Sequence, residues 1–235
     1  MITISVVSHG HGEMLKGLLG QLLEFSEVSK VVITHNIPEA ITSITNNRIL
    51  HIHNPIPKGF GANHNKAFSY CTTENFCVLN PDIEFTQNPF PFLTAVMKSH
   101  PAEIAAPLVI APNGEVEDSA RHFPTFGTLL LKFLGVSDGR HIIGQDISLF
   151  EPDWVAGMFL LFRSCTYMQL DGFDESFFLY YEDVDICRRA HKLNKKIVYC
   201  PEVAVVHHAQ RASRHNFRHM RWHFTSMLRY LGKSV

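Results

Sequence analysis

Ile2-Thr3-Ile4-Ser5-Val6-Val7 opens the chain and decides its fold class. A short β-branched run of this kind predicts a strand that is buried on both faces. A glycine-rich turn follows, and then leucines at positions 15, 18, 19, 22 and 23 give residues 13–25 the spacing of an amphipathic helix. The first two elements are therefore a strand and a helix that covers it.

The same alternation continues outward along the chain. The pattern predicts strands at 30–34, 48–53 and 75–79, a helix at 61–70, a buried strand at 154–162, a helix at 182–193, short strands at 197–200 and 203–206, and a helix from 213 onward. Strands that alternate with helices imply right-handed crossovers. We therefore expect an α/β, Rossmann-like fold with a mainly parallel central sheet flanked by helices.

Length, charge and cysteine content exclude several classes of protein. The chain has 235 residues, 46% of them hydrophobic, which excludes a disordered protein, and its net charge of -1 excludes a general nucleic-acid binder. The five cysteines form no CxxC pair, which is typical of a reduced, intracellular protein. The longest apolar run, 155–162, is far shorter than the roughly 20 residues of a membrane span. With no leader pattern at Met1, we expect a cytoplasmic protein whose only membrane contact would be peripheral, on the inner face of the cytoplasmic membrane.

The first candidate for chemistry is Asp82, which follows an apolar strand in the stretch Val78-Leu79-Asn80-Pro81-Asp82. In open parallel sheets, ligands bind beyond the carboxyl ends of the strands. Asp82 would lie in that crevice. The structural alternative is a type I turn, because Asn-Pro is a common turn opener.

The second candidate is the acidic stretch Tyr180-Tyr181-Glu182-Asp183-Val184-Asp185. Acids in the first turn of a helix complement its dipole, and this is the structural alternative. Helix capping explains poorly why an aromatic block runs directly into the acids. Apolar walls beside a carboxylate raise its pKa and make it a usable general base.

The third candidate is His207-His208, at the predicted end of a strand. Adjacent residues point to opposite faces of a strand, so at most one of the two faces a given site, and a lone histidine is more often structural. With Asp82 across the crevice, a mixed oxygen and nitrogen site for Mg²⁺ or Mn²⁺ becomes plausible. The small residues of Lys58-Gly59-Phe60-Gly61-Ala62-Asn63-His64-Asn65 would let backbone N–H groups approach a phosphate or a sugar, although the stretch is neither GxGxxG nor a Walker A loop.

In this order the elements resemble the family 2 glycosyltransferases, especially their bacterial rhamnosyltransferase-like branch. The resemblance extends from Ile4 to about Lys233. The segments that carry it are Ser5-Val6-Val7-Ser8-His9, 54–65, Leu79-Asn80-Pro81-Asp82, Arg121-His122-Phe123-Pro124-Thr125, Trp154-Val155-Ala156-Gly157, Gly172-Phe173-Asp174-Glu175, Tyr181-Glu182-Asp183-Val184-Asp185, and Val206-His207-His208 with Ser213. The resemblance implies a GT-A fold that binds a nucleotide-diphosphate sugar and a divalent cation, Mn²⁺ or Mg²⁺.

The resemblance also implies roles for the acids and the histidine. Asp82 matches the last acid of the family's DxD-type motif, which binds the metal at the donor diphosphate, whereas Asn80 replaces the first acid. His207 matches a second metal ligand. Asp183 matches the catalytic base, and its neighbour Glu182 would hold the acceptor or tune that base.

Further positions match the donor and acceptor sides of the family's site. The positions that the resemblance places beside the donor, together with Asn80 and Asp82, are Ser8, His9, Asn36, Gly59 and Asn65. Trp154 and Gly157 resemble the acceptor-side wall. The family's Asp-Asn-x-Ser is replaced by His35-Asn36-Ile37-Pro38, so the choice between a dTDP-linked and a UDP-linked donor stays open.

The expected organisation is one GT-A domain over residues 1–235. Residues 1–110 would bind the nucleotide sugar, 111–210 would bind the acceptor and catalyse transfer, and 211–235 would form a C-terminal helix. The resemblance implies an inverting transfer of a sugar to a hydroxyl of a glycan or lipid-linked acceptor, in bacterial surface polysaccharide or lipopolysaccharide synthesis. A catalytically silent nucleotide-sugar-binding or scaffold protein is the alternative on the same fold. A metal-dependent phosphohydrolase would need more acids than this chain offers.

The C-terminal helix is predicted to be amphipathic and basic. Its apolar side chains at helical spacing are Phe217, Met220, Phe224, Leu228 and Leu231, and no acid occurs after Glu202. Such a face most often packs on the domain core. The alternative is that it rests on an anionic membrane surface, where a lipid-linked acceptor would be found.

Overall fold

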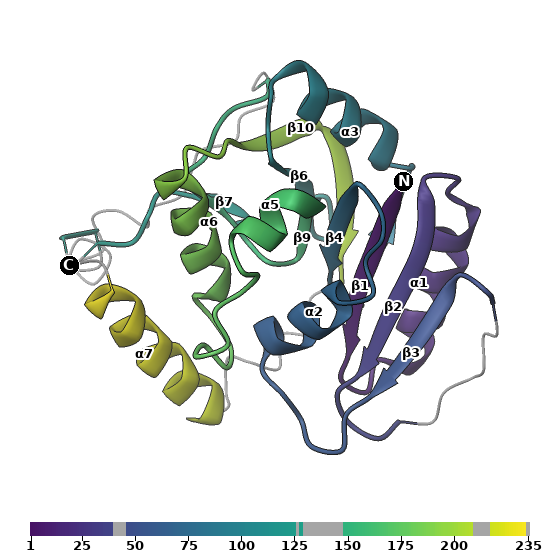
Figure 1. The fold of residues 1–235 in the computed structure, drawn as a ribbon, viewed down its shortest axis with the longest axis horizontal. Coiled ribbons are helices and arrows are strands. Elements are labelled where there is room, and N and C mark those ends of the chain that lie inside the picture. The colour runs from purple at the N-terminus through teal and green to yellow at the C-terminus, as the bar shows by residue number, and fades with distance from the viewer. Residues whose placement is uncertain (40–45, 126, 129–147, 209–216, 234–235) are drawn as a thin grey trace.

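The computed structural model describes residues 1–39, 46–125, 127–128, 148–208 and 217–233, and Figure 1 shows their arrangement. The N-terminal half alternates strands and helices as predicted. In chain order its elements are β1 (Ile2–Ser8), α1 (Gly12–Glu24), β2 (Val28–His35), β3 (Ile49–His53), α2 (Phe60–Phe68) and β4 (Asn75–Leu79). β1 pairs in parallel with β2 and β4, and β2 pairs in parallel with β3, which confirms the predicted parallel sheet.

The second half adds strands of both directions to this sheet. Its elements are β5 (Ile83–Phe85), α3 (Phe90–Ser99), β6 (Ile104–Ile110), β7 (Ala120–Arg121), β8 (Trp154–Val155), β9 (Phe159–Arg163), α5 (Ser164–Gln169), α6 (Glu182–Lys192), β10 (Ile197–His207) and α7 (Phe217–Gly232). The main sheet has eight strands in the order β3-β2-β1-β4-β9-β6-β10-β5. β9 is antiparallel to β4 and β6, and β5 is antiparallel to β10, so the sheet is mainly but not wholly parallel.

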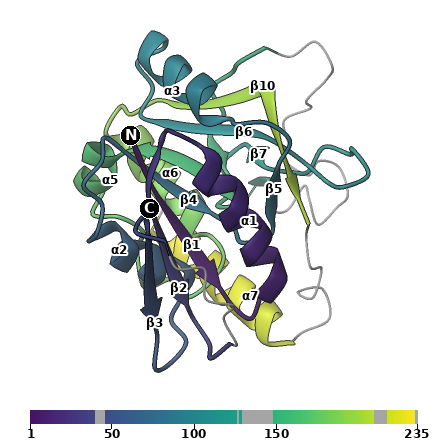
Figure 2. The ribbon, with the colours of Figure 1, turned by 90° about the vertical axis from the view of Figure 1, so that its right-hand side faces the viewer.

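Helices cover both faces of the main sheet, as Figures 1 and 2 show from two directions. The alternation of side chains along β4 explains the two layers. Cys77 and Leu79 pack in one cluster with buried side chains of α1 and α3, whereas Phe76 and Val78 pack in a second cluster with side chains of α2, α5 and α6. Because both faces of β4 are buried, its sequence is apolar at almost every position.

The predicted single strand over residues 154–162 is wrong. The chain forms two strands there, because β8 pairs with β7 in a separate two-stranded sheet while β9 pairs with β4 in the main sheet. The connecting turn holds Gly157, and a Cβ at this position would lie 3.1 Å from the ring of Phe60. Because the chain leaves one sheet before Gly157 and enters the other sheet after it, one continuous strand cannot cover residues 154–162.

The two short strands predicted at 197–200 and 203–206 are one strand, β10. Its pairing with β6 shifts register between Cys200 and Ala204, where Pro201 interrupts the ladder. The bulge explains why the sequence pattern separated the two pieces.

The packing predicted for the C-terminal helix is also wrong for most of its apolar face. Four of the five apolar side chains of that face are exposed, and only Leu231 is buried. α7 packs instead through Ser226, Tyr230 and Leu231, which lie against the aromatic segment before α6. The rings of Tyr180 and Tyr181 pack against His223, and Tyr181 also packs against Tyr230. The spacing of apolar residues does not detect such a face. Ser213, where the helix was predicted to begin, lies outside the described residues.

Candidate active site

The carboxyl ends of the parallel strands bring the predicted residues Asp82 and His207 together. β5 runs antiparallel to β10 with Ile83 opposite His207. The backbone N–H of His208 donates a 2.8 Å hydrogen bond to the carbonyl oxygen of Asp82. The segment Asn80-Pro81-Asp82 is therefore a turn, and the same turn places the Asp82 carboxylate beside the imidazole of His207.

The ring of His207 lies between two carboxylates. Its Nε2 lies 3.3 Å from Oδ1 of Asp82, and its Nδ1 is 2.7 Å from Oε2 of Glu117, with all three side chains largely buried. Burial lowers the pKa of His207, but the two neighbouring carboxylates, Asp82 and Glu117, outweigh it and raise the pKa overall. Glu117 was not predicted from the sequence.

This arrangement fits a divalent cation. Within the described residues, Oδ1 of Asp82 is buried and no donor reaches it with hydrogen-bond geometry. A carboxylate that accepts the Nδ1 proton of a histidine fixes the tautomer whose Nε2 can bind a metal. Nowhere in the described ranges do three His, Cys, Asp or Glu side chains gather to hold an ion by themselves. Mg²⁺ is commonly held by one or two carboxylates together with substrate phosphates and water; Asp82 supplies one carboxylate, and the His207 nitrogen shifts the preference towards Mn²⁺.

The second group of site residues lies at the start of α6. Tyr180 and Tyr181 both have positive φ angles, of 71° and 68°, directly before Glu182 and Asp183. Positive φ is costly for a bulky residue and recurs at functional sites, where surrounding contacts maintain it. Here α7 supplies such a contact, because the hydroxyl of Tyr180 lies 2.9 Å from Nδ1 of His219.

Asp183 is the acid of this turn that faces the rest of the site. Its Oδ2 accepts a 3.1 Å hydrogen bond from the backbone N–H of Gly157, and its Oδ1 accepts one of 2.8 Å from Val184. Burial raises the pKa of Asp183, although these hydrogen bonds and the positive charge of Arg121 act against the increase. A carboxylate with a raised pKa is a stronger base than an exposed aspartate.

The neighbouring acids are placed differently. Glu182 is buried, and burial together with the charge of Asp183 raises its pKa well above the usual range. Its Oε2 has no hydrogen-bond partner among the described residues. Asp185 is also buried, but its Oδ2 lies 2.7 Å from Nε of Arg189, so this acid is part of an ion pair that braces the helix.

A short backbone path joins the two groups. The N–H of Asn80 donates a 2.9 Å hydrogen bond to the carbonyl oxygen of Met158. The preceding residue, Gly157, donates its own N–H to Asp183. The turn between β8 and β9 therefore bridges the segment that carries Asp82 and the turn that carries Asp183.

Ser8, His9 and Asn36 meet at the ends of β1 and β2. The N–H of Asn36 donates to the carbonyl oxygen of Ser8 at 2.9 Å, and the Asn36 amide nitrogen lies 3.4 Å from Nδ1 of His9. The Asn36 amide also exchanges two hydrogen bonds, of 2.9 and 2.8 Å, with the backbone of Lys58. This residue therefore anchors the loop before α2, and its predicted contact with the donor stays a prediction.

Gly59 and Asn65 both hold the chain segment that leads to α6. A Cβ at Gly59 would lie 2.7 Å from the carbonyl oxygen of Phe178, so only glycine fits there. The Asn65 amide bonds to the backbone N–H and carbonyl of Phe173 at 2.9 and 2.8 Å and to the hydroxyl of Tyr167 at 2.8 Å. These contacts give Asn65 a bracing role, while its predicted contact with the donor stays a prediction.

Trp154 lies on β8, with its indole N–H donating a 3.0 Å hydrogen bond to the carbonyl oxygen of His122. The guanidinium of Arg121 lies 6.0 Å from the centre of the Trp154 ring. Arg121 is the side chain whose charge acts on Asp183. Gly157 therefore borders the acid directly, and Trp154 lies beside the arginine that acts on it, while their predicted contact with an acceptor stays a prediction.

Sequence reasoning assigned no role to three residues at the site, which are Glu117, Arg121 and His11. Burial lowers the pKa of His11, and the charges of Asp82 and Glu39 oppose the decrease. The signal for His11 was its place in the glycine-rich turn after β1. Glu117 lies in a connection between strands and had no comparable signal.

Comparison with known proteins identifies the family. The sequence model described as "Glycosyl transferase family 2" matches residues 32–159, which is more than half of the chain. The chain therefore belongs to glycosyl transferase family 2, and it is a glycosyltransferase.

Two curated relatives are rhamnosyltransferases. The chain is 28% identical over 249 residues to "Rhamnosyltransferase WbbL" of Escherichia coli (strain K12), and the match covers 99% of this chain and 93% of that protein. It is 29% identical over 173 residues to "N-acetylglucosaminyl-diphospho-decaprenol L-rhamnosyltransferase" of Mycobacterium tuberculosis (strain CDC 1551 / Oshkosh), covering 66% of this chain and 53% of that protein. The chain thus spans about half the length of the mycobacterial relative.

Solved structures confirm the predicted GT-A fold. The chain superimposes on a crystal structure of GalNAc-T7 with UDP, GalNAc and Mn²⁺ with a TM-score of 0.69 and 12% sequence identity, covering 89% of this chain and 43% of that one. At this identity the likeness concerns the fold alone. Within the described residues, no helix is long and apolar enough to cross a membrane.

Proposed function

We propose that the protein transfers a sugar from a nucleotide-diphosphate donor to a hydroxyl group with inversion at the anomeric carbon. The observation that carries this proposal is that one turn contacts both groups of site residues. Gly157 of this turn donates its N–H to Asp183, and the next residue, Met158, accepts a 2.9 Å hydrogen bond from Asn80. The base would lie on one side of this turn and the Asp82–His207 pair on the other. The acceptor would then lose its proton on the first side, and the donor diphosphate would leave on the second.

In this proposal the base is Asp183. An acceptor hydroxyl has a pKa far above 7, so it attacks readily only if a nearby carboxylate takes its proton as the new bond forms. The hydrogen bond from Gly157 orients Asp183, and burial raises the pKa of Asp183 and with it the affinity for the acceptor's proton. Attack opposite the leaving diphosphate inverts the anomeric carbon without a covalent intermediate.

Asp82 and His207 would hold Mn²⁺ or Mg²⁺ at the donor diphosphate. As a Lewis acid, such an ion would stabilise the charge that gathers on the leaving group, a contribution of several kcal/mol. Glu117 keeps the His207 ring in the orientation and tautomer that this role needs. The Ser8, His9 and Asn36 corner would border the nucleoside of a dTDP- or UDP-linked donor.

The relatives guide the choice of substrates. Both are named rhamnosyltransferases, and the name of the mycobacterial one includes a lipid diphosphate acceptor. We therefore propose a deoxyhexosyl or hexosyl donor and a glycan or lipid-linked acceptor, in bacterial surface polysaccharide or lipopolysaccharide synthesis. Such an acceptor would place the protein in the cytoplasm, at the inner face of the membrane.

The experiment that tests the proposal is a transfer assay with dTDP- and UDP-linked sugars, Mn²⁺ or Mg²⁺, and a lipid-linked N-acetylglucosamine acceptor. The product's anomeric configuration is read by NMR, and inversion is the expected result. A retained configuration would contradict the mechanism. Tight donor binding without transfer to any acceptor would favour the catalytically silent binder, and rapid donor hydrolysis without an acceptor would favour a hydrolase.

A further inference from the structure

The outer face of α7 exposes a row of apolar side chains. The exposed fractions are 85% for Phe217, 60% for Met220, 56% for Phe224 and 50% for Leu228. Residues three or four positions apart share one face of a helix, so these four side chains form a continuous stripe, here called the α7 stripe. A contiguous exposed apolar patch of this kind usually marks an interaction surface.

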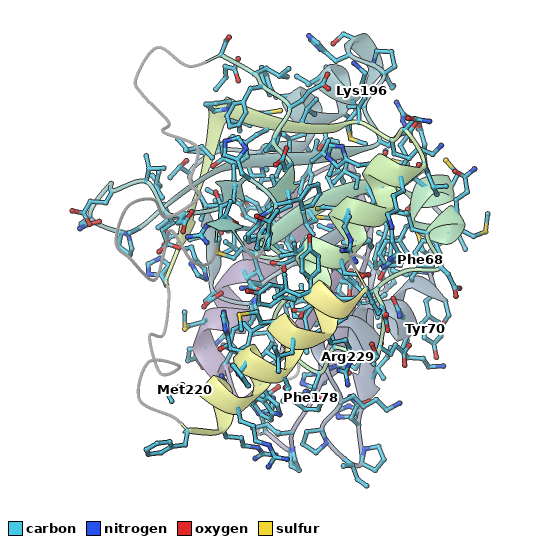
Figure 3. The ribbon with its side chains drawn as sticks, turned by 90° about the vertical axis from the view of Figure 1, so that its left-hand side faces the viewer. Phe68, Tyr70, Phe178, Lys196, Met220 and Arg229 are labelled. Carbon is cyan, nitrogen blue, oxygen red and sulfur yellow. The ribbon has the colours of Figure 1, made fainter. Side chains whose placement is uncertain are left out.

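The opposite side of the helix fixes this orientation. The Ser226 hydroxyl donates a 2.9 Å hydrogen bond to the carbonyl oxygen of Leu179, and Tyr230 is buried. Trp222 packs with its ring 4.7 Å from that of Phe178. Figure 3 shows α7 lying across the outside of the molecule, with Met220 near its first turns and Arg229 near its end. The stripe therefore faces away from the domain because the helix is held from behind.

The charged side chains that α7 itself contributes are all basic, although Lys233 just after the helix pairs with Asp174 of a neighbouring segment. Arg218 and Arg221 are exposed on the helix, whereas Arg229 donates a hydrogen bond to the carbonyl oxygen of Ser176 and so faces the domain. The guanidinium of Arg218 lies 4.8 Å from the centre of the Trp222 ring, so it is held close to the helix surface. No acid occurs anywhere after Glu202 in the sequence. An apolar stripe bordered by arginines is complementary to a surface that has hydrocarbon below and negative charge above.

We propose that the α7 stripe lies on the surface of an anionic lipid bilayer, with its apolar side chains between the acyl chains and with Arg218 and Arg221 at the lipid phosphates. The helix has 16 residues and lies parallel to the surface, because it is too short to span a bilayer. Each arginine near an anionic surface adds a modest attraction that salt screens.

The charge pattern favours lipid over a second copy of the chain. In a two-fold symmetric pair built on this stripe, each copy would place Arg218 and Arg221 against the same basic surface of its partner. Like charges that face each other weaken an interface. A bilayer that contains phosphatidylglycerol supplies the opposite charge.

The membrane contact would bring a lipid-linked acceptor close to the proposed base, Asp183. This part of the inference rests on the proposed function. Tyr180 bonds to His219 of α7 and lies three residues before Asp183. A helix that lies on the bilayer would thus hold the turn from Tyr180 to Asp183 close to the membrane surface, where the head group of a lipid-linked acceptor is found.

The test is flotation of the purified protein with vesicles of phosphatidylcholine, with and without phosphatidylglycerol. Wild type is expected to float with the anionic vesicles only, and less so as salt is added. Phe224→Asp and Leu228→Asp should each weaken the partition about tenfold or more, because each places a charge where an apolar side chain would be buried. The matched control is Met168→Asp, an apolar residue on α5 that is 66% exposed and should float as wild type does.

Thermal unfolding and calorimetric binding of UDP and dTDP establish that each variant is folded. The proposal is overturned if wild type fails to float at low salt, if both stripe variants float like wild type, or if Met168→Asp loses as much as they do. A dimer that Phe224→Asp dissociates, without vesicle binding, would also overturn it. Asp183→Asn separates the two proposals, because it should lose transfer and keep flotation.

Discussion

Nε2 of His207 lies 3.3 Å from Oδ1 of Asp82, an oxygen that is buried without a hydrogen bond from any described residue. Two acceptor atoms this close repel each other unless a proton or a cation lies between them. Glu117 bonds to the other ring nitrogen at 2.7 Å, so the ring is fixed with Nε2 turned to Asp82. This pair is the basis of the first two predictions.

Asp82→Asn keeps the shape of the side chain and removes its charge. We expect the affinity for UDP or dTDP in Mn²⁺ to fall at least about tenfold, because an amide oxygen is a weaker ligand than a carboxylate. Isothermal calorimetry measures it. The matched control is Glu84→Gln, which removes a carboxylate that pairs with His208 two residues away. Equal affinities for wild type and Asp82→Asn in Mn²⁺ would remove Asp82 from the site.

Glu117→Gln tests the carboxylate behind the histidine. The loss of this partner should weaken Mn²⁺ binding in the presence of UDP by about 10- to 100-fold, as for other groups that orient metal-bound histidines. A titration of Mn²⁺ followed by electron paramagnetic resonance gives the affinity. Glu115→Gln, at an exposed position nearby, is the control. An unchanged Mn²⁺ affinity would mean that Glu117 has only a structural contact with the ring.

Gly157→Ala tests the turn that joins the two halves of the site. The added Cβ would lie 3.1 Å from the Phe60 ring and 3.8 Å from Cβ of Asp183, so either that ring or the turn with its N–H bonded to Asp183 has to shift. We expect kcat to fall by up to about 100-fold with donor affinity kept, because a displacement of about 1 Å can cost this much and a smaller shift costs less. Steady-state kinetics provides both values. Gly20→Ala on α1, where a Cβ meets nothing within 4 Å, should keep full activity and unfold at a slightly higher temperature.

Glu182→Gln should stabilise the fold increasingly as pH rises. Burial and the charge of Asp183 raise the pKa of Glu182 in the folded state, so the folded protein keeps this proton to higher pH than the unfolded chain. Above about 4.3, the usual pKa of glutamate, the unfolded chain loses this proton while the folded protein keeps it. The free energy of unfolding of wild type therefore falls as pH rises, until Glu182 also ionises in the folded state. Thermal unfolding across pH measures the difference between the two proteins.

Asp185→Asn provides the contrast for that experiment. Asp185 is paired with Arg189 at 2.7 Å, so its loss should lower the unfolding temperature at neutral pH. If Glu182→Gln lowered the unfolding temperature by as much as Asp185→Asn at neutral pH, the assignment of an uncompensated carboxyl at Glu182 would be wrong.

The sequence predicted the class of fold and the position of Asp82 beside His207, because both depend on local patterns. Buried strands are apolar runs, and polar residues at the carboxyl ends of parallel strands meet at one edge. The raised pKa of Asp183 was predictable for a similar reason, since an aromatic block that runs into acids is unusual for a simple helix start, whereas its role as the base stays a prediction.

The remaining features depend on contacts between distant segments. Glu117 meets His207 across a separation of 90 residues, and no spacing in the chain reveals that contact. The outward face of α7 could not be predicted either, because periodicity identifies an apolar stripe but does not say what covers it. The break at Gly157 follows from the change of sheet between β8 and β9, which depends on the pairing of both strands.

The most direct test of Asp183 as the base is the measurement of kcat and donor affinity for Asp183→Asn. The asparagine keeps the shape and cannot take the acceptor proton, so kcat should fall about 10²- to 10⁴-fold. The dissociation constant for UDP or dTDP in Mn²⁺ should stay within about twofold of wild type, because Asp183 lies on the acceptor side in this proposal. A variant that binds the donor poorly and still transfers sugar at the wild-type kcat would contradict the assignment.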